Sequence, residues 1–188
     1  TIVAKKGDHI TVELENALGV PTTIHWHGLH VPFEMDGVTW MSSPVESGES
    51  FTYSFTVNQS GTYWYHPHFD TGRQVDLGLY GAIIIRDPAE PEDIEELVMI
   101  FDSWAEHYDG SDYHDHAHSD GVMRKWTING HLNPQIILDS GTAYRARMIN
   151  VSNAGYVDLS WPEMRGIGND QGLLSAPRSP ESFVLGPG

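Results

Sequence analysis

The chain contains no cysteine. This absence excludes disulfides, thiolate zinc sites, iron–sulfur clusters and a cysteine nucleophile. It also excludes a blue, type 1 copper site, because such a site needs a cysteine thiolate beside two histidines. Any metal chemistry must therefore use imidazole and carboxylate ligands, and the 11 histidines are the first candidates.

Basic residues and long apolar runs are also scarce. Only 10 Lys and Arg stand against 26 Asp and Glu, so the formal net charge is −16. Nucleic-acid binding needs clustered basic residues that neutralise phosphates, so this charge argues against such a partner. No apolar run approaches the roughly 20 residues of a membrane-spanning helix. The first residues, TIVAKKGD, contain no signal-peptide core.

The sequence is rich in short β-like segments. Hydrophobic residues make up 39% of the chain, enough for a packed core. Residues 10–16 and 51–57 alternate between apolar and polar, the period of a half-buried strand, and residues 81–85 form an apolar run typical of a central strand. Further strands are predicted at residues 22–27, 61–68, 96–101, 125–130, 135–138 and 144–150. Without a convincing helical period, this pattern predicts an all-β, antiparallel β-sandwich.

The chain divides near an acidic, proline-containing stretch. We predict a first domain at residues 1–88, a linker at 89–93 and a second domain at 94–188. The second part has too few predicted strands to close a sandwich, so we expect it to be incomplete. An incomplete sandwich would leave a strand edge exposed, such as that of residues 96–101.

Histidines occur in pairs separated by one residue. His25/His27 and His66/His68 lie in predicted strands, where residues i and i+2 point to the same face. Each pair can therefore direct two imidazoles at one point, and neutral imidazole binds copper, zinc, iron or nickel. Satisfied core histidines are the alternative. Four neutral imidazoles close together are costly to bury without a cation, so we favour a metal site.

The other histidines give weaker signals. Mixed His and Asp can hold a metal loosely, but a solvated polar loop is the better interpretation of residues 106–120. The histidines of that stretch are His107, His114, His116 and His118. We assign no function to His9, His30 and His131.

The paired histidines carry a resemblance to a known family. Residues 23–29 (TIHWHGL) resemble the first copper motif of multicopper oxidases, His-Trp-His-Gly, and residues 63–68 (YWYHPH) are similar to the second. Met35-Asp36-Gly37 between them also fits, and residues 71–81 resemble the glycine-rich, apolar strand after the second motif. Weaker similarity to the family's second domain is present at residues 129–130, 147–153 and 170–174. The resemblance is to three-domain bacterial members, the laccase-like and cuprous oxidases.

The resemblance implies a fold and a set of copper ligands. The family fold is a cupredoxin-like Greek-key β-sandwich repeated three times, with a trinuclear copper cluster held by eight histidines between the first and third domains. By position, His25 would bind the type 2 copper, His27 and His66 would share one type 3 copper, and His68 would bind the other. Asp36 would relay protons as oxygen is reduced to water. From the residues alone, Asp36 is explained equally well as a turn residue.

The resemblance also implies partners. The other four histidines and the type 1 copper belong to the family's third domain, so this chain would hold half of one cluster and would be inactive alone. One class of two-domain relatives has a cysteine where this chain has Pro67, and has copper ligands where residues 155–161 have none. The implied partners are the remainder of the oxidase on the same or a separate chain, O2, and a phenolic or metal-ion electron donor. The implied location is periplasmic or extracellular.

Two other functions are compatible with the sequence. A non-catalytic scaffold of the same fold is one, although retention of all four paired histidines argues against it. A His-rich zinc-binding or zinc-hydrolase module is the other. Such a module normally uses a carboxylate motif such as His-Glu-x-x-His, which the sequence does not contain.

Overall fold

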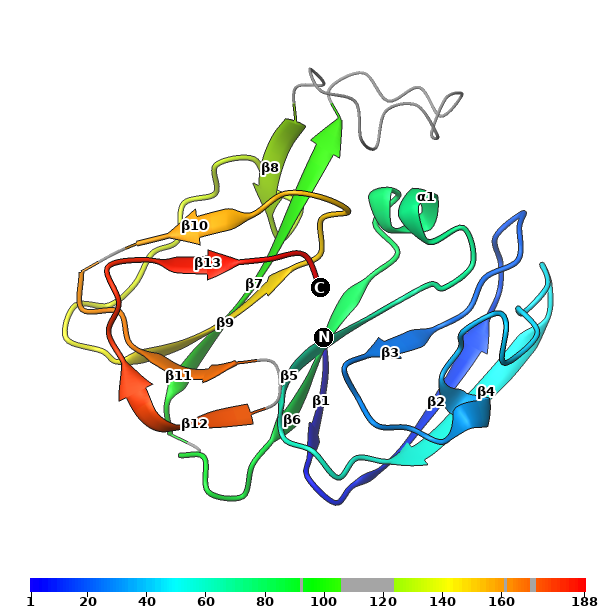
Figure 1. Ribbon diagram of the computed structural model, residues 1–188, viewed down its shortest axis with the longest axis horizontal. Coiled ribbons are helices and arrows are strands. Elements are labelled where there is room, and N and C mark those ends of the chain that lie inside the picture. Colours follow the sequence, from blue (N-terminus) through cyan, green and yellow to red (C-terminus); the bar gives the residue numbers. More distant parts are fainter. Residues whose placement is uncertain (92, 106–123, 161, 170–171) are drawn as a thin grey trace. The chain divides into compact units, whose positions relative to one another are not determined.

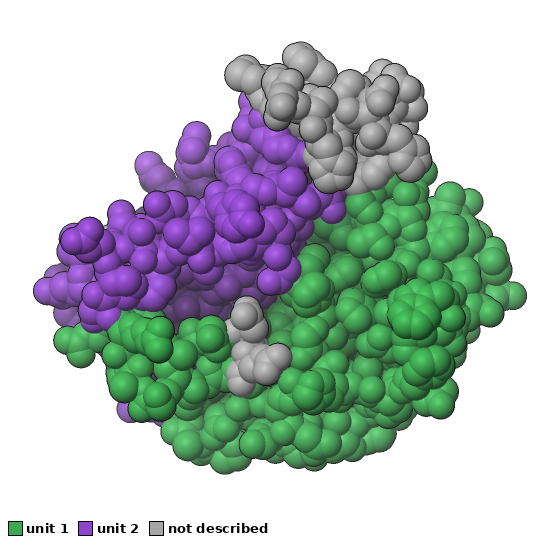
Figure 2. Space-filling model, viewed as in Figure 1, with its two compact units in different colours: residues 1–90, 165–178 green, residues 91–164, 179–188 purple. Residues whose placement is uncertain are grey.

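Figure 1 shows a computed structural model of the protein. It describes residues 1–91, 93–105, 124–160, 162–169 and 172–188, and these are mostly β. The chain forms two compact units, unit 1 (Thr1–Glu90 and Arg165–Arg178) and unit 2 (Pro91–Met164 and Ser179–Gly188), coloured green and purple in Figure 2. No helix in the described part of the chain is long and apolar enough to cross a membrane.

Two β-sheets form most of unit 1. The first has the order β1-β6-β5-β3, from β1 (Ile2–Lys5), β6 (Gly81–Arg86), β5 (Gly61–His66) and β3 (His25–His27). The second pairs β2 (His9–Glu15) with β4 (Ser50–Thr56) in antiparallel register. The pairs in the first sheet are antiparallel except β1 and β6, which run parallel. The parallel pair is not predicted from the sequence, because alternation within a strand carries no information about its neighbour.

The two sheets of unit 1 enclose one apolar core. Its buried members are Ile10, Trp26, Leu29, Tyr53, Phe55, Val57, Tyr63, Ile83 and Ile85. Trp26 on β3 has no exposed surface, and its ring centroid lies 5.0 Å from that of Phe55 and 5.6 Å from that of Tyr53. Burying a large apolar side chain contributes about 1.5–3 kcal/mol, so this cluster fixes which face of β3 turns inward.

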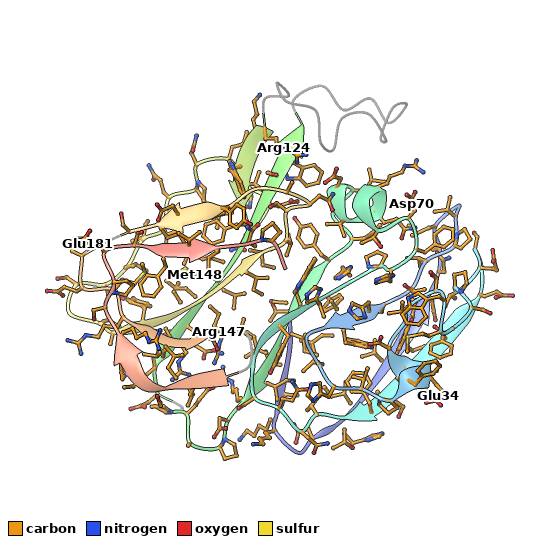
Figure 3. The ribbon with its side chains drawn as sticks, in the orientation of Figure 1. Glu34, Asp70, Arg124, Arg147, Met148 and Glu181 are labelled. Atoms are coloured by element: carbon orange, nitrogen blue, oxygen red, sulfur yellow. The ribbon has the colours of Figure 1, made fainter. Side chains whose placement is uncertain are left out.

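A short helix replaces part of a predicted strand. The family resemblance implies a glycine-rich, apolar strand at residues 71–81, but the structure forms α1 (Thr71–Asp76), which follows Asp70 (Figure 3). Gln74 is buried, and its Nε2 donates to the Pro21 carbonyl oxygen at 2.9 Å. The prediction is wrong here because a contact with a remote loop fixes the helix, and the local pattern does not contain that information.

Unit 2 contains a three-stranded sheet of order β8-β7-β9. Its central strand β7 (Glu95–Ala105) runs parallel to β9 (Tyr144–Asn150) and antiparallel to β8 (Arg124–Ile128). A two-stranded sheet pairs β10 (Val157–Leu159) with β13 (Phe183–Leu185).

Two predictions for this part of the chain are wrong. Residues 135–138 are predicted as a strand, but they belong to no strand and Ile137 is 90% exposed. Residues 96–101 are not an open edge. They pair with β9 on one side, and on the other the Asn129 side chain accepts from the Ile100 N–H and donates to the Val98 carbonyl oxygen.

The remaining two strands, β11 (Gly166–Asn169) and β12 (Gly172–Arg178), pair with each other and belong to unit 1. The chain passes from unit 1 to unit 2 between Glu90 and Pro91. The domain limits of 1–88 and 94–188 stay a prediction.

Candidate metal centre

Strand pairing places three histidines on one face. Strand β3 is antiparallel to β5, with His25 opposite His66 and His27 opposite Trp64. Directly opposed residues of such a pair project to the same face, with Cβ atoms about 4.5–5.5 Å apart. Trp26, between the two β3 histidines, points to the opposite face and is buried in the core. Because Trp26 is buried in the core, the imidazoles of His25 and His27 project from the opposite face of β3.

The ring nitrogens of the three histidines are close enough to bind metal together. One nitrogen from each of His25, His27 and His66 lies within 4.8 Å of the other two. Nδ1 of His27 is 3.2 Å from Nε2 of His66. Two nitrogens bound at about 2.0–2.1 Å to one tetrahedral ion are about 3.3 Å apart. The His27–His66 pair therefore fits a single ion.

His68 joins the group from beyond the end of β5. The sequence predicts that the strand continues to residue 68, but it ends at His66. The His68 main-chain N–H donates to Thr23 Oγ1 at 2.8 Å. Its ring centroid lies 5.4 Å from that of His25 and 6.3 Å from that of His66. The structure thus brings the four histidines together, with three in the tight group and His68 beside it.

Main-chain carbonyls hold two of the rings. His25 Nδ1 lies 2.9 Å from the Asp36 carbonyl oxygen, and His66 Nδ1 lies 2.8 Å from the Pro67 carbonyl oxygen. A carbonyl oxygen only accepts, so in each ring Nδ1 carries the proton and donates it. The lone pair is then on Nε2, which is the nitrogen that a metal would bind.

Burial keeps His66 neutral. The pKa of its imidazole is lowered from 6.5 to about 4, chiefly because the ring is buried. The hydrogen bond to the Pro67 carbonyl opposes this shift, and the neighbouring His25, His27 and His68 add to it. At neutral pH the Nε2 lone pair of His66 is therefore available to a cation.

An indole covers one side of the group. Trp64 is 8% exposed, and its ring stacks on His66 with centroids 4.1 Å apart and on His27 with centroids 5.0 Å apart. Among the described residues, its Nε1 has no hydrogen-bond partner. Its neighbours Tyr63 and Tyr65 pack toward the core. Because side chains alternate along β5, Trp64 lies on the same face as the histidines, and Tyr63 and Tyr65 lie on the face that packs against the core.

Asp36 lies beside His25, after the short helix η1 (Phe33–Met35). Its carboxylate Oδ1 is 3.4 Å from His25 Nδ1, and the side chain is 24% exposed. The same residue forms a turn, since its N–H donates to the Phe33 carbonyl oxygen and Gly37 follows with φ +70°. Its position is compatible with a turn and with a proton relay, and the relay stays a prediction.

Two residues that support the histidines are not found by sequence reasoning. Thr23 accepts the His68 N–H across 45 residues of chain, and Gly37 lies against the main chain just before His25. Neither contact follows from periodicity, because each depends on how two distant segments meet. Their positions in the sequence are the only signals that could have found them, since Thr23 begins the first motif and Gly37 ends the Met-Asp-Gly segment.

Histidines outside the group have different surroundings. His9 is exposed, and its ring nitrogens lie 3.1 Å from Thr56 Oγ1 and 2.9 Å from Ser54 Oγ. His30 and His131 are also exposed. The polar stretch lies outside the described residues, with its histidines His107, His114, His116 and His118.

The donor set fits copper. All three donors of the tight group are imidazole nitrogens, and no carboxylate of the described residues belongs to it. Imidazole suits copper and zinc, whereas carboxylate and carbonyl oxygens suit magnesium and calcium. Thiolate ligands are absent from the sequence. The site therefore favours a transition metal that accepts nitrogen ligands.

Comparison with known proteins identifies the family. A family model described as multicopper oxidase matches residues 1–90. Multicopper oxidase mco of Staphylococcus haemolyticus (strain JCSC1435) is 32% identical over 203 residues, covering 100% of this chain and 44% of that protein. This chain belongs to the multicopper oxidase family.

Two further proteins, one of them a solved structure, are also similar to this chain. The crystal structure of a multi-copper oxidase from Pseudomonas Thermotolerans has a TM-score of 0.89 and 32% identity, covering 100% of this chain and 48% of that one. Copper resistance protein A of Escherichia coli is 48% identical over 103 residues, 52% of this chain and 16% of that protein. The chain thus spans less than half the length of each of these relatives.

These findings confirm the family and the cupredoxin-like β fold that the sequence predicts. The chain corresponds to roughly the first half of three-domain multicopper oxidases. The group of His25, His27 and His66 is consistent with ligands of the trinuclear copper site of this family.

Proposed function

We propose that His25, His27, His66 and His68 supply four of the eight histidines of a trinuclear copper cluster. His25 is assigned to the type 2 copper, His27 and His66 to one type 3 copper, and His68 to the other. The observation that carries the proposal is the group of ring nitrogens within 4.8 Å of one another. This group comes from both copper motifs and lies in the part of the chain that the family model matches.

The activity proposed for the whole oxidase is one-electron oxidation of phenols or metal ions, coupled to four-electron reduction of O2 to water. Copper at these histidines would supply the one-electron redox chemistry that amino-acid side chains lack. Two relatives are named copper resistance protein A and iron transport multicopper oxidase fetC, so copper and iron ions are among the donors to test. A periplasmic or extracellular location is proposed with this activity.

The chain's own residues prepare the ligands. The carbonyls of Asp36 and Pro67 keep a proton on Nδ1 of His25 and His66, which leaves Nε2 of each ring for the metal. Burial keeps His66 neutral, and Trp64 excludes water from one side of the His66 ring. His25 and His66 therefore present a lone pair without a change of tautomer.

Asp36 is proposed to carry protons. Reducing O2 to water consumes protons, so a carboxylate beside the site is useful. Asp36 Oδ1 lies 3.4 Å from His25 Nδ1, and the side chain is partly exposed, so it faces both the site and solvent. In this proposal Oδ1 takes a proton from solvent and releases it toward the cluster.

A complementary portion of the oxidase would supply the other four histidines and the type 1 copper. A type 1 site cannot form within this chain, because the sequence contains no cysteine. One or two imidazoles for each ion leave most coordination positions to water. The chain alone would therefore hold copper weakly and would not turn over O2.

Oxygen uptake after copper loading tests the proposal. The chain combined with the third-domain portion of the oxidase should consume O2 with a phenolic or ferrous donor, whereas the chain alone should not. His25→Ala or His66→Ala should abolish uptake and reduce the copper content. His9→Ala, a change at an exposed histidine outside the group, should alter neither. Preferential loading with zinc in competition, or turnover by the chain alone that a chelator removes, would contradict the proposal.

A further inference from the structure

The segment that follows η1 presses directly on the main chain of the first copper motif. Glu34, labelled in Figure 3, marks this short helix. Gly37 is buried and has φ +70°. A Cβ added there would lie 2.0 Å from the Ile24 carbonyl oxygen and 3.2 Å from the His25 nitrogen. Glycine is therefore required on two grounds, its backbone conformation and the space beside β3.

The close approach at Gly37 sets the position of the preceding carbonyl. The Asp36 carbonyl oxygen belongs to the peptide group that Gly37 shares, and it lies 2.9 Å from His25 Nδ1. The atoms nearest to an added Cβ are main-chain atoms of Ile24 and of His25, the first residue of β3, and main-chain atoms cannot rotate away as a side-chain tip does. A side chain at residue 37 would thus push the turn outward and lengthen the bond from His25 to this carbonyl.

The Asp36 carboxylate is a weaker partner for the same ring nitrogen. Its Oδ1 is 3.4 Å from His25 Nδ1, beyond the usual 2.7–3.2 Å of an N–H···O hydrogen bond. The main-chain oxygen at 2.9 Å lies within this range. The tautomer of His25 is therefore held through the main chain.

We propose that Gly37 is a positioning residue for the metal centre. Because it has no side chain, the turn seats the Asp36 carbonyl on His25 Nδ1–H, and this bond presents Nε2 of His25 to the metal. The proposal rests on the proposed copper function for the identity of the ion. It also separates two tasks at Asp36, since the main chain holds the ring and the carboxylate is left for proton transfer.

The test reads the tautomer in the metal-free protein. Long-range ¹H–¹⁵N spectra of the ¹⁵N-labelled chain at about pH 8 distinguish a protonated ring nitrogen from one with a lone pair. Wild-type His25 should show protonated Nδ1. Gly37→Ala should give a mixture of tautomers at His25, and its Cu(II) affinity should fall about 10–100-fold, the usual effect of losing a partner that orients a ligand.

Two variants serve as controls. Gly48→Ala introduces the same kind of backbone strain, since Gly48 has φ +84°, but an added Cβ there meets nothing within 4 Å. It should keep both the wild-type tautomer and the wild-type affinity. Asp36→Ala removes the carboxylate and keeps the carbonyl, so the Nδ1–H tautomer at His25 should persist.

A further variant covers the case in which Gly37→Ala does not fold. Glycolic acid in place of Gly37 turns the shared amide into an ester, which weakens the Asp36 carbonyl as an acceptor without adding a side chain. The Nδ1–H signal of His25 should then shift toward that of a freer ring, and tautomer exchange should appear.

Two results would overturn the proposal. One is an unchanged His25 tautomer in both Gly37→Ala and the ester variant, and the other is loss of the Nδ1–H tautomer in Asp36→Ala. Failure of the wild-type chain to prefer copper would instead refute the proposed function, because the tautomer is measured without metal.

Discussion

Two polar clusters are held by paired strands, one in each unit, and they differ in how their atoms are matched. In unit 2, Arg145 and Arg147 of β9 donate to Glu96 Oε1 on β7 at 3.1 and 2.8 Å (Arg147 is labelled in Figure 3). In unit 1, the Nε2 lone pair of His66 faces Nδ1 of His27 at 3.2 Å. The first cluster joins cations to an anion of the chain, whereas the second gathers imidazole rings with no carboxylate among the described residues of its tight group. Imidazole nitrogens suit a transition-metal cation that comes from outside the chain, whereas the Glu96 carboxylate already has its cationic partners within the chain.

Breaking the matched cluster should have the largest effect on stability. Glu96→Gln removes the carboxylate from two arginine side chains that are 8% and 6% exposed. Removing one member of a buried ion pair costs about 3–5 kcal/mol. Urea unfolding should show this loss, and Glu13→Gln, at an exposed acid, should change the free energy of unfolding by less than about 0.5 kcal/mol. If Glu96→Gln lowered the free energy of unfolding by less than about 1 kcal/mol, the Glu96 ion pairs would not have the structural role that distinguishes them from the histidine cluster.

Lowering the pH should reduce the contribution of His66 to the stability of the metal-free chain. The folded pKa of His66 is about 4, below its ordinary value of 6.5, so the unfolded chain takes up this proton first as the pH falls. Its contribution to stability is complete above pH 6.5, decreases through the window from 6.5 to about 4, and is absent below it. The shift corresponds to about 3 kcal/mol.

The pH effect is measured as a difference between two proteins. Urea unfolding of the metal-free chain is compared with that of His66→Gln at several pH values, which cancels the titration of other groups. The difference in the free energy of unfolding should change across the window. A constant difference from pH 7 to 4 would show that His66 is protonated alike in both states.

Copper should stabilise the folded wild-type chain through the histidine cluster, independently of the Glu96 ion pairs in unit 2. At free Cu(II) of about 100 times the dissociation constant, binding to the folded state adds about 2.7 kcal/mol. This increment should vanish in His66→Gln and persist in Glu96→Gln, as measured by thermal unfolding with and without Cu(II). Equal stabilisation of wild type and His66→Gln would place the copper elsewhere.

Replacing Trp64, whose indole stacks on the histidines, should have the smallest effect of these changes, a modest loss of Cu(II) affinity. Stacking of aromatic rings adds about 0.5–1.5 kcal/mol beyond burial, so Trp64→Leu should weaken Cu(II) binding by about tenfold or less. Trp64→Phe keeps a ring and should lose less. Competition with a chelator of known affinity measures both, and Trp126→Leu in unit 2 is the control. Equal losses for Phe and Leu would mean that Trp64 acts by volume alone.

Local pattern predicts much of the fold. The strand at residues 144–150 is predicted at its observed limits. The strand at 51–57, where apolar and polar residues alternate, lies within one residue of β4. Helix α1 is missed because Gln74 is held by residues some 50 positions away. Residues 136–138 are apolar but belong to no strand and are exposed, so their composition alone is misleading.

The sequence predicts which histidines form the site, but it does not predict the contacts that position them. Spacing of i and i+2 places His25 and His27 on one face, and Trp26 in the core confirms that alternation. The register that sets His25 opposite His66 is not readable from either motif, because it depends on the pairing of β3 with β5. The contacts of the Asp36 and Pro67 carbonyls cannot be predicted either, because every residue has a main-chain carbonyl and the sequence does not show which one accepts a hydrogen bond.

Trp26 links the core to the histidine cluster within three consecutive residues, His25 to His27. Its indole is fully buried and contacts the aromatic rings of Tyr53, Phe55 and Tyr65, while the histidines on either side face the opposite way. A substitution beneath this strand that moves the indole by an ångström also moves both flanking imidazoles. The core under β3 therefore has little freedom to change over evolutionary time, because a change that packing tolerates must also leave the arrangement of these histidines intact.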